Sequence, residues 1–324
     1  MSDWTEAFDA AVVRTIANED RPYTIADATT RTSLGVDAME RLVRAVGLRW
    51  PEPGESAFGE ADLAFFESYA LACAAFGDEL TLHFARNMSM AMARVGHAAV
   101  ALFLVTMGES LRGQPEPAQL AGAELSGAVF NGLPPVLERL MRLHALRAVQ
   151  RWRQHRDRPE RFDVQPLAVG FVDLVGFTEQ TRDLDASELA ALVVRFETLA
   201  HDAVSSSGGE VVKLIGDEVM FVADSAADAC RVARALEAAF AGGEITPRGG
   251  VAYGPVLARG GDFYGSIVNI AARLTALAEP GEVLVTGEVT DAVGPAHEGH
   301  FAPAGRRALK GFPTPVKTYS LASA

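Results

Sequence analysis

The chain has 324 residues, of which 49% are hydrophobic and 22% charged, as in an ordinary globular protein. At about 100–200 residues per domain, this length favours two domains. The formal net charge of −13 disfavours a DNA- or RNA-binding protein, whose charge balance is usually positive. The two cysteines, Cys73 and Cys230, do not suggest a disulfide framework and fit a reducing cytoplasm.

The apolar patterning does not predict a secreted or membrane-spanning protein. Met1–Asp9 is acidic and lacks the apolar segment of a signal peptide. Ala98–Met107, the longest apolar run, is far shorter than the roughly 20 residues of a membrane span, and we expect it to form a buried helix. We therefore expect a cytoplasmic protein with no transmembrane segment.

Residues 1–157 have the periodicity of helices. Thr24–Trp50 predicts two short helices joined by a small turn, an arrangement similar to a helix-turn-helix. Two longer helices should follow, with a break near Gly77-Asp78, and Val136–Gln154 predicts another helix. The arginine-rich stretch 147–161 is interpreted as a solvated linker. We assign 1–157 to an all-helical domain.

Residues 158–324 have a different pattern, in which short apolar runs alternate with amphipathic helices. The expected elements are a strand at Leu167–Asp173, a helix at Ala186–Ser206 capped by Asp185, a hairpin turning at Gly216-Asp217, a helix at Ser225–Ala241, a second hairpin formed by Gly249–Gly254 and Pro255–Arg259, a helix at Ser266–Ala278 and a strand at Glu282–Thr286. The order β-α-β-β-α-β predicts an α+β fold, a ferredoxin-like α/β sandwich.

Two acidic residues stand where this layout could bring them together. Asp173 ends the first strand and Asp217 lies at the hairpin turn. Neighbouring carboxylates repel each other unless a cation joins them, and Mg²⁺ prefers a few carboxylates together with substrate phosphates. In the alternative interpretation, Asp173 caps the next element and Asp217 only fills the turn.

Three segments, in this order, resemble the motifs of the class III nucleotide cyclases. They are FVDLVGFT at Phe171–Thr178, KLIGDE at Lys213–Glu218 and DFYGSIVNIAAR at Asp262–Arg273. The resemblance covers about 166–290, with a weaker tail to Tyr319. It implies an adenylate cyclase that converts ATP to 3′,5′-cyclic AMP and pyrophosphate with two Mg²⁺ or Mn²⁺ ions.

The resemblance also implies a role for each matching residue. Asp173 and Asp217 would bind the metal ions, with Leu174 beside them. Lys213 and Asp262 would recognise the base. Asn269 would orient the ribose, and Arg273 would neutralise charge on the α-phosphate. The remaining substrate-binding candidates are Phe177, Thr178 and Lys310, the last of which would reach the β- or γ-phosphate.

The chemistry of adenine agrees with the proposed base-reading pair. Adenine offers a ring-nitrogen acceptor beside an amino donor, which a lysine donor and an aspartate acceptor complement. Guanine presents the reverse pattern, so ATP is favoured over GTP and guanylyl cyclase activity is the less favoured alternative. In the family, one domain supplies the metal aspartates and the other the asparagine and arginine, so this chain should act as a homodimer.

The helical half resembles, more loosely, the regulatory domain of some soluble bacterial cyclases. This implies that residues 1–157 dimerise and control the catalytic domain at 158–324, with a small molecule, a lipid or a proton as candidate inputs. His83, His97 and His144 are the candidates for a proton-sensing role, and the alternative for each is a packed or solvated histidine. A competing hypothesis is a transcription factor whose 24–50 region binds DNA, but the acidic balance and the complete catalytic set disfavour it, and no nucleic-acid partner is expected.

Overall fold

The computed structural model describes residues 13, 20–111, 125, 127–155, 163–177, 181–182, 184–240, 246–294 and 300–322, without the side chains of 103–111 and 154–155. It divides into two compact units, Met1–Leu146 and Arg147–Ala324. The domain boundary expected after residue 157 lies outside the described residues, as does part of the arginine-rich stretch. No helix in the described ranges is long and apolar enough to cross a bilayer.

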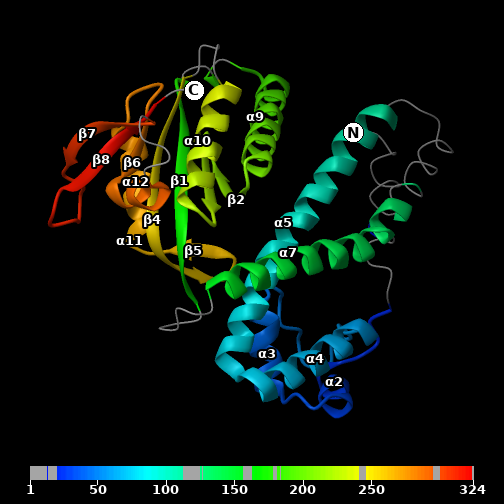
Figure 1. Ribbon diagram of the computed structural model, residues 1–324. Helices are drawn as coiled ribbons and strands as arrows, with labels where there is room; N and C mark the ends of the chain where they lie inside the picture. The colour runs from blue at the N-terminus through cyan, green and yellow to red at the C-terminus, as the bar shows by residue number, and fades with distance from the viewer. Residues whose placement is uncertain are drawn as a thin grey trace. The chain divides into compact units, whose positions relative to one another are not determined.

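The first unit is helical (Figure 1). Its elements are α2 (Ile25–Arg31), α3 (Val36–Ala45), α4 (Glu60–Phe76), α5 (Asp78–Leu111) and the first part of α7 (Leu133–His155). Met39 and Leu42 of α3 are fully buried beside Phe66 of α4, whose ring lies 5.3 Å from that of Phe58. Gly77, with φ +86°, ends α4 and confirms the predicted break, because glycine adopts this conformation without strain.

One prediction for this unit is wrong. The apolar run Ala98–Met107 lies in α5, but the described part of it is not buried, because Val100 is 37% and Leu102 62% exposed. α5 is 34 residues long and extends beyond the small core that α2, α3 and α4 provide.

The second unit is built on a mixed sheet (Figure 1). Its strands are β1 (Val164–Val175), β2 (Gly209–Ile215), β3 (Glu218–Ala223), β4 (Thr246–Arg259), β5 (Asp262–Tyr264), β6 (Val283–Thr286), β7 (Phe301–Arg307) and β8 (Val316–Leu321). Its helices are α9 (Ala186–Ser206), α10 (Ala226–Phe240), α11 (Ser266–Leu277) and α12 (Gly287–Val293). The strand order β2-β3-β1-β4-β6-β8-β7, with β5 paired to β4, contains the four-strand core of a ferredoxin-like fold and confirms that prediction.

The predicted hairpin within 249–259 is wrong. β4 runs unbroken from Thr246 to Arg259 and pairs with β1 along its length. Gly254 has φ +159°, which is close to extended backbone, so Gly254-Pro255 does not turn the chain. The turn comes later, at Gly260-Gly261, where both residues have positive φ and β4 meets β5.

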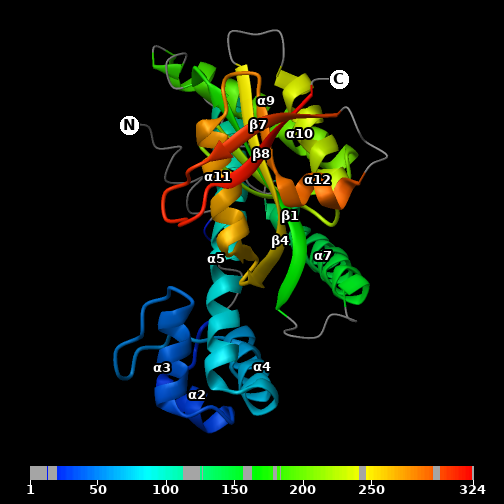
Figure 2. The same cartoon turned by 60° about the vertical axis from the view of Figure 1, so that its left-hand side comes forward.

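Helices cover the two faces of this sheet. Alternate residues of β1 point to opposite faces. Ala168 and Val172 pack in the cluster with α9 and α10, whereas Val169 and Phe171 pack in the cluster with α11. Figure 2 shows α10 and α11 on opposite sides of β1 and β4. Continuing this alternation, Asp173 points to the face that carries α11.

Candidate active site

A row of charged residues crosses three strands at one end of β1. Asp173 is paired in register with Glu218 on β3 and with Arg248 on β4, so the three side chains share one face of the sheet. The Arg248 guanidinium donates to Oδ2 of Asp173 from both Nε, at 2.9 Å, and Nη2, at 2.8 Å. Arg248 was not predicted from the sequence, because only the register of β4 places it beside Asp173.

Asp217 joins this row from the hairpin turn between β2 and β3. Gly216, with φ +64°, forms the tight turn with Asp217. Burial raises the pKa of Asp217, and the charge of Asp173 raises it further. Burial, with the charges of Asp173 and Asp217, raises the pKa of Glu218 to about 7. Three carboxyl groups therefore face one guanidinium, Arg248, and the local excess of negative charge favours a bound cation.

The donor set fits a hard divalent cation that completes its coordination with a substrate. Asp173 and Asp217 offer carboxylate oxygens, and Mg²⁺ typically takes one or two of these together with phosphate and water oxygens. Among the described residues, no three His, Cys, Asp or Glu side chains form a complete metal site. The Leu174 side chain is 3% exposed and packs in the α9–α10 cluster, so only its main chain could reach a ligand.

The predicted base-reading residues lie together. Lys213 is in β2 and pairs with Met220, whose side chain belongs to the cluster on the α11 face. Its Nζ lies 2.5 Å from Oδ2 of Asp262 in β5, and the two side chains are 37% and 27% exposed. Oδ1 of Asp262 accepts a hydrogen bond from the Phe263 amide at 2.8 Å, which fixes the carboxylate. The structure thus joins residues 49 positions apart into one polar pair.

Asn269 and Arg273 lie one helical turn apart on α11, so they share a face of that helix. Asn269 is exposed, and the Arg273 guanidinium lies 5.1 Å above the ring of Phe312. Lys310 is exposed and follows Leu309, which is buried with Leu274 of α11. Within the described chain, no hydrogen bond or ion pair joins Asn269 or Arg273 to the carboxylates of the charged row.

The two remaining candidates are placed differently. Phe177 is 9% exposed, and its ring centroid lies 6.1 Å from that of Phe196, so its side chain belongs to the core. Gly176, just before it, has φ +92°. Thr178 lies outside the described residues.

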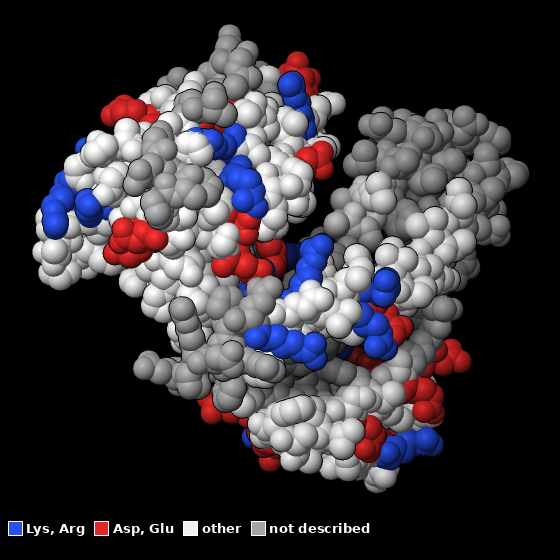
Figure 3. Space-filling view, viewed as in Figure 1, with Lys and Arg blue, Asp and Glu red and all other residues white. Residues whose placement is uncertain are grey.

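Among the described residues, basic and acidic side chains are mixed on the face of the molecule that Figure 3 shows. Nucleic-acid binding proteins typically gather lysine and arginine on one face. The face in view does not have that character.

Comparison with known proteins identifies relatives. Residues 160–323 match the adenylate and guanylate cyclase catalytic domain. An adenylate cyclase of Streptomyces coelicolor is 34% identical over 279 residues, covering 83% of this chain and 71% of that protein. One of Streptomyces griseus is 34% identical over 281 residues, covering 84% and 68%. A solved adenylyl cyclase of P. aeruginosa aligns at 24% identity and TM-score 0.44, covering 50% of this chain and 95% of that one.

Proposed function

The chain belongs to the adenylate and guanylate cyclase family, with its catalytic domain at residues 160–323, and we propose that it converts ATP to 3′,5′-cyclic AMP and pyrophosphate at sites shared by two copies. The family match confirms the predicted enzyme class, a nucleotide cyclase and therefore a lyase. Both Streptomyces relatives are named adenylate cyclases, which supports ATP as the substrate.

The Lys213–Asp262 pair is proposed to select ATP as the substrate. The ammonium is a donor for a ring nitrogen of adenine, and the carboxylate is an acceptor for its amino group. The 2.5 Å ion pair supports this role, because it shows that both groups reach one place on the α11 face. Guanine would leave both groups mismatched, at about 1–3 kcal/mol for each unpaired buried group.

Asp173 and Asp217 are proposed to hold two Mg²⁺ or Mn²⁺ ions. When bound, the ions would polarise the ribose 3′-hydroxyl and neutralise charge on the triphosphate. The excess of carboxylates over the single Arg248 guanidinium supports this assignment. Asp173 and Asp217 orient the reacting groups, and no protein side chain is assigned as a general base.

Asn269 and Arg273 are proposed to act on the substrate held by the partner copy. Asn269 would orient the ribose, and Arg273 would stabilise charge that develops on the α-phosphate. Lys310 would contact the outer phosphates. Its position after Leu309, which packs with α11, supports a place near Arg273.

The activity is tested with the purified full-length chain, Mn²⁺ and either ATP or GTP. We expect the chain to form cyclic AMP from ATP at least about tenfold faster than cyclic GTP from GTP. This factor follows because guanine would leave two groups mismatched. Asp173→Ala should be nearly inactive. Asp202→Ala, which removes an exposed carboxylate on the opposite face of the sheet, should behave as wild type. Cyclic GTP as the main product, or no cyclic nucleotide, would contradict the proposal.

The shared site is tested by mixing inactive variants. Asp173→Ala and Arg273→Ala should each be nearly inactive, but a heterodimer of the two restores one intact site. The matched control mixes Asp173→Ala with Asp217→Ala. Each copy then lacks one of the two metal-binding aspartates, so both sites of the heterodimer are disabled. If tagged heterodimers of the first pair form and remain inactive, the site is not shared.

We also propose that residues 1–157 dimerise and control catalysis, with a small molecule, a lipid or a proton as the input. Exposed apolar side chains on α4 and α5 support a partner surface. Leu71, Phe76, Leu80 and Phe84 are 61–74% exposed. Cyclic AMP production by the full-length chain and by residues 147–324, compared across pH, tests this control. Identical rates and pH profiles would contradict it.

A further inference from the structure

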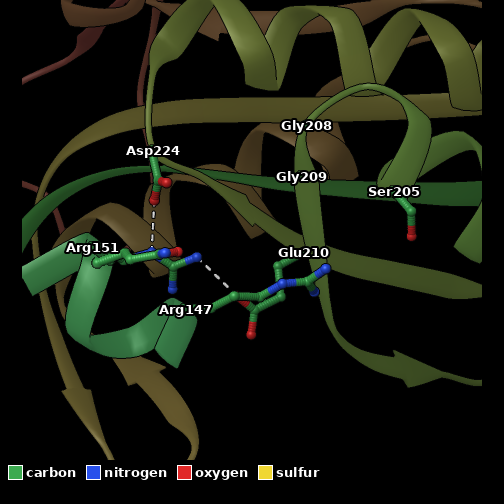
Figure 4. A pocket seen from close by; sticks show the side chains of 8 residues that line it. Arg147, Arg151, Ser205, Gly208, Gly209, Glu210 and Asp224 are labelled. Carbon is green, nitrogen blue, oxygen red and sulfur yellow. Dashed lines mark hydrogen bonds and ion pairs between the residues drawn. The ribbon is translucent and has the colours of Figure 1, made fainter. Parts of the chain in front are cut away.

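Arg151, near the end of α7, lies in the second unit and forms ion pairs with two acids of the same unit. Its Nη2 lies 2.8 Å from Oε2 of Glu210, and its Nε lies 2.6 Å from Oδ1 of Asp224. The Arg151 side chain is only 15% exposed, against 36% and 41% for its partners. Figure 4 shows the guanidinium reaching from the helix to both carboxylates. Arg151 is therefore held far more firmly than a surface arginine.

The two acids mark the open end of the β2–β3 hairpin. Glu210 is the second residue of β2, and Asp224 directly follows the last residue of β3. Arg151 thus bridges the two strands at the end opposite their turn. Beside the bridge is a cavity of about 270 Å³, lined by Arg147, Gln150 and the Gly208-Gly209 backbone among others.

This hairpin carries two residues of the candidate active site. Lys213 lies in β2, and Asp217 lies in the turn. β2 is the edge strand of the sheet, with β3 as its sheet neighbour, and its register shifts between Val211 and Lys213. An irregular edge strand has fewer backbone hydrogen bonds to fix it than a central strand. The placement of Lys213 and Asp217 therefore depends more on other restraints.

We propose that Arg151 is a positioning residue for the cyclase reaction, which sets the β2–β3 hairpin by bridging Glu210 and Asp224. The inference rests on the proposed function. Breaking the bridge leaves either a partly buried guanidinium without these two carboxylates or two acids without their cation. The charge that remains is poorly compensated, so the hairpin should shift or loosen. Displacing a substrate- or metal-binding group by about 1 Å can cost on the order of 100-fold in rate.

The test uses Arg151→Gln in the full-length chain. We expect kcat to fall about tenfold, and both the KM for ATP and the half-saturating Mn²⁺ concentration to rise about threefold or more. Hydrogen exchange of the 210–223 amides should become faster. A purely structural loss would lower only the active fraction, leaving KM and Mn²⁺ dependence unchanged, and that result would overturn the proposal.

The matched control is Arg142→Gln, which removes an exposed α7 ion pair to Glu138 at 2.7 Å. It should leave kinetics and hairpin exchange unchanged. Adding Arg151→Gln to the Glu210→Gln/Asp224→Asn variant should cause a smaller loss than Arg151→Gln causes in the wild-type chain, because the bridge is already broken. Fully additive losses would contradict the bridge. If the wild-type chain made no cyclic AMP, the proposed function would fail, whereas hairpin exchange would still test Arg151.

Discussion

Gly250 permits α11 to lie directly on the sheet, and replacing it should displace the helix that carries Asn269 and Arg273. A Cβ at residue 250 would lie 2.4 Å from the carbonyl oxygen of Ala271 and 2.5 Å from the amide nitrogen of Thr275. Both are backbone atoms of α11, so no side-chain rotation relieves the clash. Thr275 also donates to the Phe171 carbonyl at 3.2 Å, which ties the helix to β1.

The size of the effect follows from these distances. Ordinary contact begins near 3.4 Å, so Gly250→Ala requires α11 to move by about 1 Å, the difference between 3.4 and 2.4 Å. Overpacking of this kind costs about 1–3 kcal/mol of unfolding free energy. A 1 Å displacement of positioning groups lowers the rate by about 100-fold. We therefore expect a modest loss of stability and a large loss of kcat.

Thermal unfolding and initial rates of cyclic AMP formation measure the two effects. Gly287→Ala is the matched control in the same unit, because its new Cβ would meet nothing closer than 3.8 Å. The control should retain wild-type Tm and kcat. If Gly250→Ala retained both as well, the close approach of α11 would not position the site as described.

Three further outcomes are expected. Lys213→Met or Asp262→Asn should lower kcat/KM for ATP by about 10–100-fold and reduce the ATP preference over GTP, and unchanged selectivity in competition assays would refute base recognition. The pKa of Glu218 is raised to about 7, so the folded state holds this proton more tightly than the unfolded chain does. Folding stability should therefore fall as the pH rises from the ordinary pKa of a glutamate towards 7. After allowance for the partial exposure of Glu218, the loss of unfolding free energy is roughly 1–2 kcal/mol. Glu218→Gln should therefore flatten the Tm–pH curve from pH 5 to 8. An equal slope in that variant would show that other groups cause the trend. Burial raises the pKa of the Cys230 thiol to about 12, so thiol reagents should modify native Cys230 far more slowly than Cys73, as peptide mapping would show.

Local signals in the sequence predict much of the catalytic unit. Asp185 caps α9 by accepting from the amides of Ser187 and Glu188, as its place before the helix predicts. Gly216-Asp217 forms the turn between β2 and β3. Such features depend on a few neighbouring residues, so their positions can be read directly from the chain.

The features missed in the catalytic unit depend on contacts between distant segments. Arg248 and Asp173 are 75 positions apart and meet only through the register of β1 and β4. Arg151 and Asp224 are 73 positions apart. A hairpin was predicted between Gly249–Gly254 and Pro255–Arg259, but Pro255 pairs with Pro166 inside a continuous strand. In each case tertiary pairing decides the outcome, and local composition does not record it.

The most direct test of the central claim is product analysis with ATP and Mn²⁺ as the only substrate and metal. The purified full-length chain should form cyclic AMP and pyrophosphate in equal amounts, resolved by chromatography and a pyrophosphate assay. Equal amounts are required because a single attack of the 3′-hydroxyl on the α-phosphorus releases both products. ADP with inorganic phosphate, or ATP left unchanged, would contradict the account.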